Sequence, residues 1–401
     1  MAPALLPAET ALQRVLEGIG AADEETVPIA LAIGRVLTRD LAARLTQPPF
    51  NASAMDGYAI HGANAATPGD RWTVVGEAAA GAAFQGTVGT GEAVRIFTGA
   101  PVPDACGTVV IQEDVSRDGD IIQATSATSA GANIRPAGND FTKGDTLLKR
   151  GRRLDAHSAT LAASMGYGDA PVARRPVVAL IATGDELVPP GTLPGPDQIV
   201  SSNPVGLAAL IAGTGATPRD LGIAPDDRDA LAARIAEATS ADVLVTIGGA
   251  SVGDRDLVGP VLKEHGVDLD FWKVAIRPGK PLMFGRLGNT RVLGLPGNPV
   301  SALVTARVFL VPLLRALQGE TLADTVPETA ILTEPLEANG PRLHLMRGEL
   351  ARNGDGALTV TAMPSQDSSL LSALAASDCL IRRQPDAPAL SAGAAVEIER
   401  L

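Results

Sequence analysis

The stretch Ala241-Asp-Val-Leu-Val-Thr-Ile-Gly-Gly-Ala-Ser-Val-Gly-Asp254 joins a short apolar run directly to a turn of glycines, a serine and an aspartate. The apolar run predicts a buried strand, and the glycines leave backbone N–H groups exposed at the end of that strand. Ligands of open α/β sheets bind at the carboxyl ends of the strands. Turns rich in glycine and proline follow at 277–281 and 294–299, and the first carries Arg277 and Lys280. We therefore expect an anion-binding surface along 241–299.

The segments on either side of this stretch predict an α/β domain. Val177-Val-Ala-Leu-Ile-Ala182 is a continuous apolar run, as in a strand buried on both faces. Predicted helices of roughly 10–15 residues alternate with strands from there onward, which indicates a mostly parallel sheet with right-handed crossovers. The expected helices are 203–212, 228–238, 256–264 and 301–317, and the expected strands are 177–182, 218–223, 243–247, 269–276, 282–287 and 291–295.

The remaining segments have different patterns. Apolar residues spaced on one face predict a helix at 9–20, and a second short helix is expected at 29–37. Short apolar runs between Gly and Asp turns predict a β-rich unit within 70–150, and similar runs predict a small β domain at the C-terminal end. Asp155 is the expected N-cap of a further helix.

Length and composition limit the class of protein. With 401 residues the chain is expected to form several domains, and a hydrophobic fraction of 45% is typical of globular proteins. The net charge of −12 disfavours a general binder of nucleic acid or anionic membrane, because such proteins need a basic surface. No apolar run reaches the roughly 20 residues of a membrane span, and the N-terminus lacks the pattern of a signal peptide, so a cytoplasmic protein is expected. The two cysteines have no metal-ligand spacing.

Acidic side chains follow two of the predicted strands. Asp185 and Glu186 come after the first strand of the α/β domain, and Asp254 follows the third. Carboxylate oxygens are ligands that suit Mg²⁺, and Arg277 and Lys280 would neutralise a phosphate or another oxyanion. These groups indicate a metal–phosphate site, with ordinary turns and solvated charges as the alternative. No P-loop motif is present.

Other candidate residues carry a weaker signal when they are considered locally. Asp56 lies in a turn of small and polar residues, and local chemistry favours a turn cap for this carboxylate. The four histidines are scattered and none has a second metal-type ligand at a suitable spacing. This scatter disfavours zinc chemistry. No nucleophile elbow surrounds any serine, so hydrolysis by a catalytic triad is disfavoured as well.

Seven motifs occur along nearly the whole chain. They are Ser53-Ala-Met-Asp-Gly-Tyr-Ala59, Arg95-Ile-Phe-Thr-Gly-Ala-Pro-Val-Pro103, Asn133-Ile-Arg135 with Gly138-Asn-Asp140, Thr183-Gly-Asp-Glu-Leu187, Gly248-Gly-Ala-Ser-Val-Gly-Asp254, Lys280-Pro281 and Gly294-Leu-Pro-Gly-Asn-Pro-Val-Ser301. In this order they resemble the motifs of the molybdopterin molybdenumtransferase family, which includes bacterial MoeA and the E-domain of animal gephyrin. A single motif would be unspecific, whereas all of them in one order are highly specific.

The resemblance implies an elongated homodimer with four domains in each subunit. Residues 1–46 and 141–175 would form a mixed α/β N-terminal domain, into which a β-rich domain, 47–140, is inserted. Residues 176–325 would form a three-layer α/β/α molybdopterin-binding domain with a mostly parallel sheet, and 326–401 a small C-terminal β domain similar to a barrel. The family's active site lies between the α/β domain of one subunit and the β-rich domain of the other.

The implied reaction inserts molybdenum into adenylyl-molybdopterin, with Mg²⁺-dependent cleavage of the phosphoanhydride and release of AMP, to give molybdenum cofactor. Molybdate and adenylyl-molybdopterin are the expected substrates, and Mg²⁺ is the expected cofactor. The catalytic residues that we expect are Asp56, Thr98, Asp140, Glu186, Lys273 and Lys280. Those expected to bind substrate are Thr183, Gly184, Gly248, Gly249, Ser251, Gly253, Arg277, Pro296, Pro299 and Ser301. Those expected to bind the metal are Asp185, Glu186 and Asp254.

Two other functions remain as alternatives. The first is the molybdopterin adenylyltransferase activity of stand-alone α/β proteins, which share the Gly-Gly-x-Ser-x-Gly turn but lack the β-rich insert that carries Asp56. The second is a non-catalytic carrier or scaffold, for which the array of carboxylates has no evident use. An adenylyltransferase and recipient molybdoenzymes are the further partners that the resemblance suggests, and no nucleic-acid or membrane partner is expected.

Overall fold

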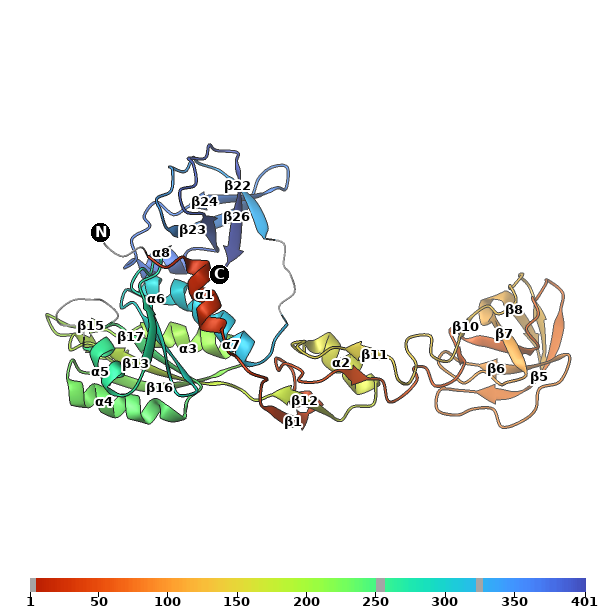
Figure 1. Cartoon of the computed structure of the whole chain (residues 1–401). Coiled ribbons are helices and arrows are strands. Elements are labelled where there is room, and N and C mark those ends of the chain that lie inside the picture. Colours follow the sequence, from red (N-terminus) through yellow and green to blue (C-terminus); the bar gives the residue numbers. More distant parts are fainter. Residues whose placement is uncertain (1–4, 250–256, 322–326) are drawn as a thin grey trace.

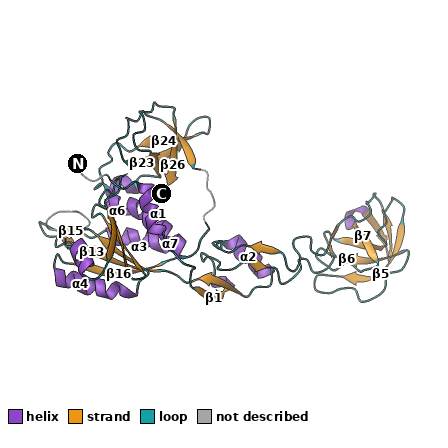
Figure 2. Ribbon diagram, viewed as in Figure 1, coloured by secondary structure: helices purple, strands orange, loops and turns teal. Residues whose placement is uncertain are grey.

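The chain forms an elongated molecule in which a narrow middle part separates two larger ends (Figure 1). The computed structural model describes residues 5–249, 257–321 and 327–401. The α/β domain and the C-terminal β domain lie together at one end, and a β-rich domain lies at the other. Helices gather at the first end, whereas the far end consists almost entirely of strands and loops (Figure 2). Ser251, Gly253 and Asp254, three of the expected site residues, lie outside the described residues.

The α/β domain contains a six-stranded sheet in the order β16-β13-β17-β21-β20-β18. The strands, in this order, are Thr217–Ala224, Val177–Thr183, Val243–Ile247, Thr290–Leu295, Met283–Leu287 and Asp268–Trp272. The first four strands are parallel, and the last two add antiparallel pairings. The connection from β20 to β21 is a tight turn at Gly288, and such a short link can join only antiparallel neighbours. The sheet is therefore mostly parallel, as predicted.

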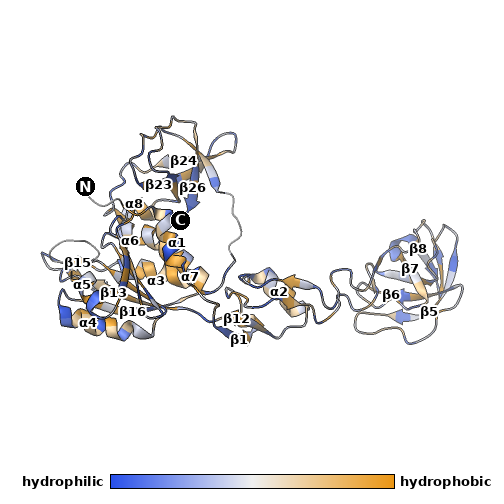
Figure 3. Cartoon of the chain, in the orientation of Figure 1, coloured by the Kyte–Doolittle hydropathy of each residue, from blue (hydrophilic) through white to orange (hydrophobic). Residues whose placement is uncertain are grey.

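Helices cover both faces of this sheet because the side chains of its strands alternate in direction. On one face of the sheet, Val178 and Leu180 of β13 belong to a buried core that includes residues of α1, α3, α6 and α7. On the other face, Ala179 and Ile181 belong to a core that includes residues of α4 and α5. The helices are Ala8–Leu16 (α1), Asn203–Gly213 (α3), Arg228–Glu237 (α4), Val258–Glu264 (α5), Pro299–Thr305 (α6) and Val311–Leu317 (α7). Figure 3 shows that α3 and α7 are strongly hydrophobic, whereas α4 carries hydrophilic residues as well.

The segment Pro299–Leu317 is helical throughout and is the one described helix that is long and apolar enough to cross a membrane. The sequence prediction expected no such segment. Its side chains nevertheless belong to the core of the α/β domain, where Val300, Phe309 and Leu313 are fully buried. A π-helical turn at Ala306–Leu310 separates α6 from α7. The turn precedes Pro312, which has no N–H group and whose ring would clash with a regular α-helical turn.

The middle part consists of two chain segments that pair with each other. Strand β1, Glu24–Pro28, is antiparallel to β12, Asp169–Ala173, and α2, Ala156–Ser164, covers the second segment. Asp155 caps α2 as predicted, since its Oδ1 accepts a hydrogen bond of 2.7 Å from the Ser158 N–H group. The prediction of a helix at 29–37 is wrong. Only a 3₁₀ turn at Ile29–Leu31 forms, because Gly34, at φ +78°, turns the chain into an extended segment.

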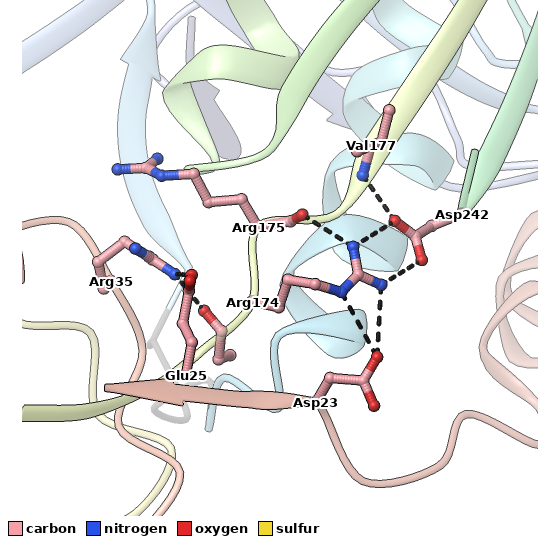
Figure 4. A network of polar contacts seen from close by, with 8 residues as sticks. Asp23, Glu25, Arg35, Arg174, Arg175, Val177 and Asp242 are labelled. Atoms are coloured by element: carbon pink, nitrogen blue, oxygen red, sulfur yellow. Dashed lines mark hydrogen bonds and ion pairs between the residues drawn. The ribbon is translucent and has the colours of Figure 1, made fainter. Parts of the chain in front are cut away.

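A network of charged residues fixes the junction between the middle part and the α/β domain (Figure 4). Arg174 donates two hydrogen bonds to Asp242, of 2.7 and 3.0 Å, and lies 3.4 Å from Asp23. Burial alone would raise the pKa of Asp242, but hydrogen bonds from Arg174 and from the Val177 N–H group lower it. Arg35 pairs with Glu25 on the other side of the crossing chain. Asp242 and Asp23 thus hold the connecting segment through Arg174, whereas Arg35 holds it through a hydrogen bond to the Ala173 carbonyl oxygen.

The β-rich domain is a six-stranded sheet in the order β7-β4-β6-β5-β9-β8. The strands, in this order, are Cys106–Ile111, Gly57–His61, Glu92–Ile96, Arg71–Ala78, Ile121–Ala124 and Val115–Asp118. A ribbon of two chain segments joins the sheet to the middle part. In it the Gln47 N–H group donates to the Phe141 carbonyl at 2.9 Å, and β3, Ala52–Ser53, pairs with β10, Ile134–Arg135. The connection is narrow and places the β-rich domain well away from the α/β domain (Figure 1).

The C-terminal domain is a closed five-stranded barrel. Its strands are Glu328–Leu332 (β22), Leu343–Arg352 (β23), Leu358–Ala362 (β24), Cys379–Arg383 (β25) and Ala395–Arg400 (β26), and the pairing of β23 with β25 closes the ring. A short strand of the preceding domain, β19 (Ile276–Arg277), pairs with β23. Leu343, Leu345 and Leu380 also enter the core of the α/β domain. The barrel is therefore anchored against the sheet that carries the expected site.

Candidate functional site

A cavity of about 1270 Å³ lies between the α/β domain and the barrel. Its floor is formed at the carboxyl ends of the parallel strands β13, β17 and β21, which is the edge of the sheet that the sequence predicts as the ligand site. Its opposite wall comes from the barrel and includes Arg342 and the loop 366–369. The volume exceeds the usual range for drug-sized ligands, so a large substrate fits.

Glycine is required in the floor of the cavity. Gly248 and Gly249 have φ angles of +93° and +59°, a region that side chains other than glycine adopt at a cost. A Cβ atom on Gly249 would lie 2.2 Å from the Val258 side chain, and one on Gly248 would lie 2.9 Å from the Thr183 carbonyl oxygen. The chain therefore exposes bare backbone to the cavity, as it does where phosphate groups approach the main chain closely.

Three cationic side chains line the cavity. Arg277 and Lys280 flank a turn in which Gly279, at φ +103°, lies close to the α6 residue Thr305, and Arg342 comes from the barrel. The barrel residue that pairs with Arg277 is His344. The positive charges are therefore concentrated where the two domains meet.

The pKa of His344 reflects this concentration of positive charge. Burial first, and then the charges of four arginines, Arg277, Arg342, Arg383 and Arg347, together lower the pKa of His344 to about 4. The imidazole is consequently neutral at pH 7. Of the four arginines, Arg277 and Arg342 line the cavity.

Among the described residues three carboxylates also line the cavity, those of Glu186, Asp226 and Asp367. The Asp367 Oδ1 accepts hydrogen bonds from the N–H and hydroxyl groups of Ser369. Asp185 does not line it, because its Oδ1 accepts a hydrogen bond of 3.0 Å from the Asp226 N–H group and so fixes the neighbouring loop. Among the described residues no three acidic, histidine or cysteine side chains form a metal cluster. Mg²⁺ is commonly held by one or two carboxylates together with phosphates of the substrate, so Glu186 and Asp226 fit such an ion.

The barrel wall of the cavity is ordered by a buried arginine. Arg347, 1% exposed, donates to the carbonyl oxygens of Ser365, Asp367 and Leu370 at 2.9 to 3.0 Å. The loop that it holds reaches the α/β domain, where Asn298 donates to Ser368 Oγ at 2.8 Å. The cavity wall is thus tied to both domains.

The carboxylate of Asp56 lies in the β-rich domain and is held by one residue of the next motif. Its Oδ1 accepts hydrogen bonds from Thr98 N–H at 2.8 Å and from Thr98 Oγ1 at 2.7 Å. The N–H bond, the Thr98 hydroxyl and the charge of Arg95 lower the pKa of Asp56, which is therefore ionised well below neutral pH. Among the described residues no hydrogen bond reaches Oδ2, which leaves this oxygen open to a ligand.

Models of three protein families match successive parts of the chain. They are described as the MoeA N-terminal region with domains I and II, residues 6–166, a probable molybdopterin binding domain, residues 179–316, and the MoeA C-terminal region with domain IV, residues 329–401. A molybdopterin molybdenumtransferase of Haemophilus influenzae is 37% identical over 92% of this chain and 91% of its own. The chain belongs to the molybdopterin molybdenumtransferase family. It is therefore an enzyme of a transferase family.

Further relatives agree with this assignment. The molybdopterin molybdenumtransferase of Bacillus subtilis is 31% identical over 94% of this chain and 89% of its own. The crystal structure of the molybdopterin biosynthesis moeA protein from Pyrococcus horikoshii OT3 matches with a TM-score of 0.85 at 27% identity, and the match covers 99% of this chain and 100% of that one. The elongated arrangement of this transferase is thus similar to that of a solved structure along its whole length.

The expected site residues that the structure describes fall into three groups. Those that line the cavity are Thr183, Gly184, Glu186, Gly248, Gly249, Arg277, Lys280, Pro296, Pro299 and Ser301. Asp56, Thr98 and Asp140 lie in the β-rich domain or in the ribbon leading to it, and a single subunit does not bring them to the cavity. Lys273 and Asp185 belong to the α/β domain but do not line the cavity. The individual roles of all these residues stay predictions.

Several residues of the cavity were not predicted from the sequence, and Asp226 is one of them. Arg342, Asn298 and Ser368 line it, and Arg347 holds its wall. An arginine within a predicted apolar strand is unusual, and Arg347 in the strand 343–349 was the available signal. Asn298 was interpreted only as a helix cap. In the structure no side-chain hydrogen bond caps α6, and Asn298 instead bonds Ser368.

Proposed function

We propose that this transferase inserts molybdenum into adenylyl-molybdopterin and releases AMP, with Mg²⁺ as the cofactor, to give molybdenum cofactor. The observation that supports this best is the cavity, which among the described residues combines exposed backbone, three cations and three carboxylates in one space. Adenylyl-molybdopterin carries a phosphoanhydride and molybdate is an oxyanion, so both substrates are anionic. The arrangement of cations and carboxylates suits both substrates and their metal ion.

The residues of the cavity suggest how the reaction is divided among them. Arg277, Lys280 and Arg342 would bind the oxygens of phosphate and molybdate, and the backbone at Gly248 and Gly249 would approach the pterin phosphate. A bound Mg²⁺, held by Glu186 and Asp226, would neutralise charge on the phosphoanhydride. Water adds to phosphorus as the anhydride bond breaks, and AMP leaves with its oxygen. Molybdenum then bonds to the two dithiolene sulfurs, and the displaced oxygen leaves as water.

We further propose that the active enzyme is a homodimer in which the β-rich domain of one subunit completes the cavity of the other. Asp56 is partly exposed, is ionised at neutral pH and has one open carboxylate oxygen. Such a group is suited to aligning a water molecule or a metal-bound water for attack on the anhydride. Its distance from the cavity of its own subunit is the reason for invoking a second subunit (Figure 1).

The direct test is incubation of the protein with adenylyl-molybdopterin, Mg²⁺ and molybdate, followed by measurement of AMP release. We expect AMP to appear only when molybdate is present and molybdenum cofactor to form in equal amount. ATP-dependent adenylylation of free molybdopterin would instead indicate an adenylyltransferase. Tight binding of adenylyl-molybdopterin without AMP release would indicate a carrier. Either of these results would overturn the proposal.

A further inference from the structure

Arg95 of β6 lies directly beneath the turn that carries Asp56. Its Nη1 donates to the Gly57 carbonyl oxygen at 3.0 Å, and its Nη2 donates to Gln112 Oε1 at 2.6 Å. The guanidinium also lies over two aromatic rings, 5.0 Å from the centre of Tyr58 and 4.7 Å from that of Phe97. The head group therefore has a fixed position, because charge-assisted hydrogen bonds and cation–π contacts act on it from several sides.

These contacts connect the ends of three strands. Arg95 is the cross-strand partner of Tyr58 in the β4–β6 ladder, and Gln112 directly follows β7. The Gln112 N–H group donates to the Asp56 carbonyl oxygen at 3.1 Å. The main chain at Asp56 and Gly57 is thus held through Gln112 and Arg95.

The side chain of Asp56 is held from the same strand as Arg95. Thr98 follows three residues after Arg95 and supplies both donors to Asp56 Oδ1. A shift of β6 or of the turn would therefore change the direction in which Oδ2 points. The geometry of this carboxylate depends on a residue that does not touch it.

We propose that Arg95 is a positioning residue for the reaction, which fixes the Asp56 turn so that the open carboxylate oxygen has one orientation toward the cavity of the second subunit. The inference rests on the proposed function, since it assumes that Asp56 acts in that cavity. A catalytic group that is displaced by about 1 Å loses roughly 100-fold in rate. Arg95 therefore affects the chemical step more than it affects substrate binding.

The same domain offers a matched control. Arg71 of β5 also donates to a glutamine on a neighbouring segment, Gln123 Oε1, at 3.3 Å, and Arg71 pairs with Gln123 across the β5–β9 ladder. Among the described residues no hydrogen bond or ion pair connects Arg71 to Asp56 or Thr98. Arg71→Met thus removes an arginine–glutamine contact from the same sheet without disturbing the Asp56 turn.

The first experiment compares steady-state kinetics of AMP release. For Arg95→Met we expect kcat to fall about 10- to 100-fold while KM for adenylyl-molybdopterin changes less than about threefold. Arg95→Lys keeps the charge but loses the planar guanidinium group with its paired donors. Its kcat should therefore lie between that of Arg95→Met and that of the native enzyme. Arg71→Met should retain native kcat. A native kcat in Arg95→Met, or equal losses in Arg95→Met and Arg71→Met, would overturn the proposal.

A second variant covers the case in which Arg95→Met disturbs folding. Gln112→Leu removes one acceptor of Arg95 at an exposed position, and the arginine remains between its aromatic rings. We expect kcat to fall about 3- to 10-fold, since one charge-assisted hydrogen bond is lost, and KM to stay unchanged. If kcat of Gln112→Leu is native while Arg95→Met is both inactive and thermally unstable, Arg95 has a structural role only and the proposal is wrong.

Mixed dimers then separate this inference from the proposed function. Subunits with Arg95→Met are mixed with subunits with Lys280→Gln, and separately with subunits with Asp56→Asn. We expect activity to recover in the first mixture and not in the second, because Arg95 and Asp56 then belong to the same half of the site. Recovery with Asp56→Asn overturns the inference about Arg95. If Asp56→Asn and Lys280→Gln fail to complement each other, the shared site is wrong, and the kinetic comparison of Arg95→Met with Arg71→Met then decides the role of Arg95 alone.

Discussion

The cavity and the Asp56 turn differ in almost every physical property. The cavity is large, lies between two domains and is lined by three cations in a protein whose net charge is −12. The Asp56 turn is a partly exposed edge of a small β sheet, with one carboxylate whose Oδ1 is bound by Thr98. The first has the means to bind an anionic substrate but offers few groups for proton transfer. The second offers such a group, the carboxylate of Asp56.

This difference indicates a division of labour between the two regions. A cationic cavity stabilises phosphate and molybdate, whereas an ionised carboxylate inside the same cavity would repel them unless a metal ion intervened. A carboxylate on a separate domain reaches the substrate only when the two regions approach each other. The elongated shape of the subunit prevents that approach within one chain (Figure 1). The predictions below change one region at a time.

The largest effect is expected for Asp56→Asn. This change keeps the shape of the side chain but removes its charge, so kcat for AMP release should fall about 100-fold or more. Asp70→Asn is the control, because Asp70 Oδ2 accepts hydrogen bonds from Thr67 N–H at 2.7 Å and Oγ1 at 2.9 Å in the same domain. The two carboxylates have nearly the same local structure. Comparable kcat values for the two variants would remove Asp56 from the mechanism.

The next largest effect is expected for Lys280→Gln in the cavity. The loss of one cation should lower kcat/KM about 10- to 100-fold, because a charge-assisted hydrogen bond to an anionic substrate is lost. Lys263→Gln is the control, since Lys263 lies in the last turn of α5 and does not line the cavity. Steady-state kinetics at two salt concentrations test the electrostatic origin. An unchanged kcat/KM for Lys280→Gln would mean that the cavity cations do not bind the substrate.

A smaller effect is expected for Arg347→Met in the barrel. The change leaves several loop carbonyls without their donor, so the free energy of unfolding should fall by about 2 kcal/mol, and KM should rise as the cavity wall loosens. Arg352→Met on the same strand removes an exposed arginine that donates only to the Gly356 carbonyl among the described residues, at 2.7 Å, and should change neither quantity. Thermal denaturation and kinetics provide the measurements. Equal stability of the two variants would contradict the role given to Arg347.

The smallest effect is expected from Thr98→Val, and it depends on pH. The Thr98 N–H bond contributes most to the lowered pKa of Asp56, followed by the hydroxyl, and only the hydroxyl is removed. In the proposed mechanism Asp56 acts as a carboxylate, so activity should be present above its pKa and be lost as the pH falls through that value. Thr98→Val raises this pKa, so the acidic limb of the kcat/KM profile should move to higher pH. An acidic limb at its native position would show that another group sets it.

Much of the α/β domain could be predicted from the sequence because its signals are local. Buried strands such as β13 and β17 are continuous apolar runs, and Asp155 caps its helix as expected. The helix expected at 29–37 does not form, because the apolar periodicity is short there and Gly34 adopts a positive φ angle. The floor of the cavity could be predicted in the same way, from the glycines at the ends of the strands.

The rest of the site could not be predicted locally, since it depends on contacts between distant segments. Arg342 and Ser368 of the barrel line the cavity because the barrel lies against the α/β domain, where β23 pairs with β19. Asp56 has the local chemistry of a capped turn, and Asp70 has nearly the same hydrogen bonds. Only the resemblance to a family distinguished the two carboxylates. A local motif therefore predicts the geometry of a side chain, while its use depends on what faces it.

The measurement that tests the shared site most directly uses mixed dimers of Asp56→Asn and Lys280→Gln subunits. Each parent is expected to be nearly inactive. After dissociation and random reassembly, molybdate-dependent AMP release should recover to about a quarter of the native rate, because half of the dimers are mixed and each mixed dimer has one whole site out of two. A rate no higher than the average of the two parents would contradict a site built from two subunits.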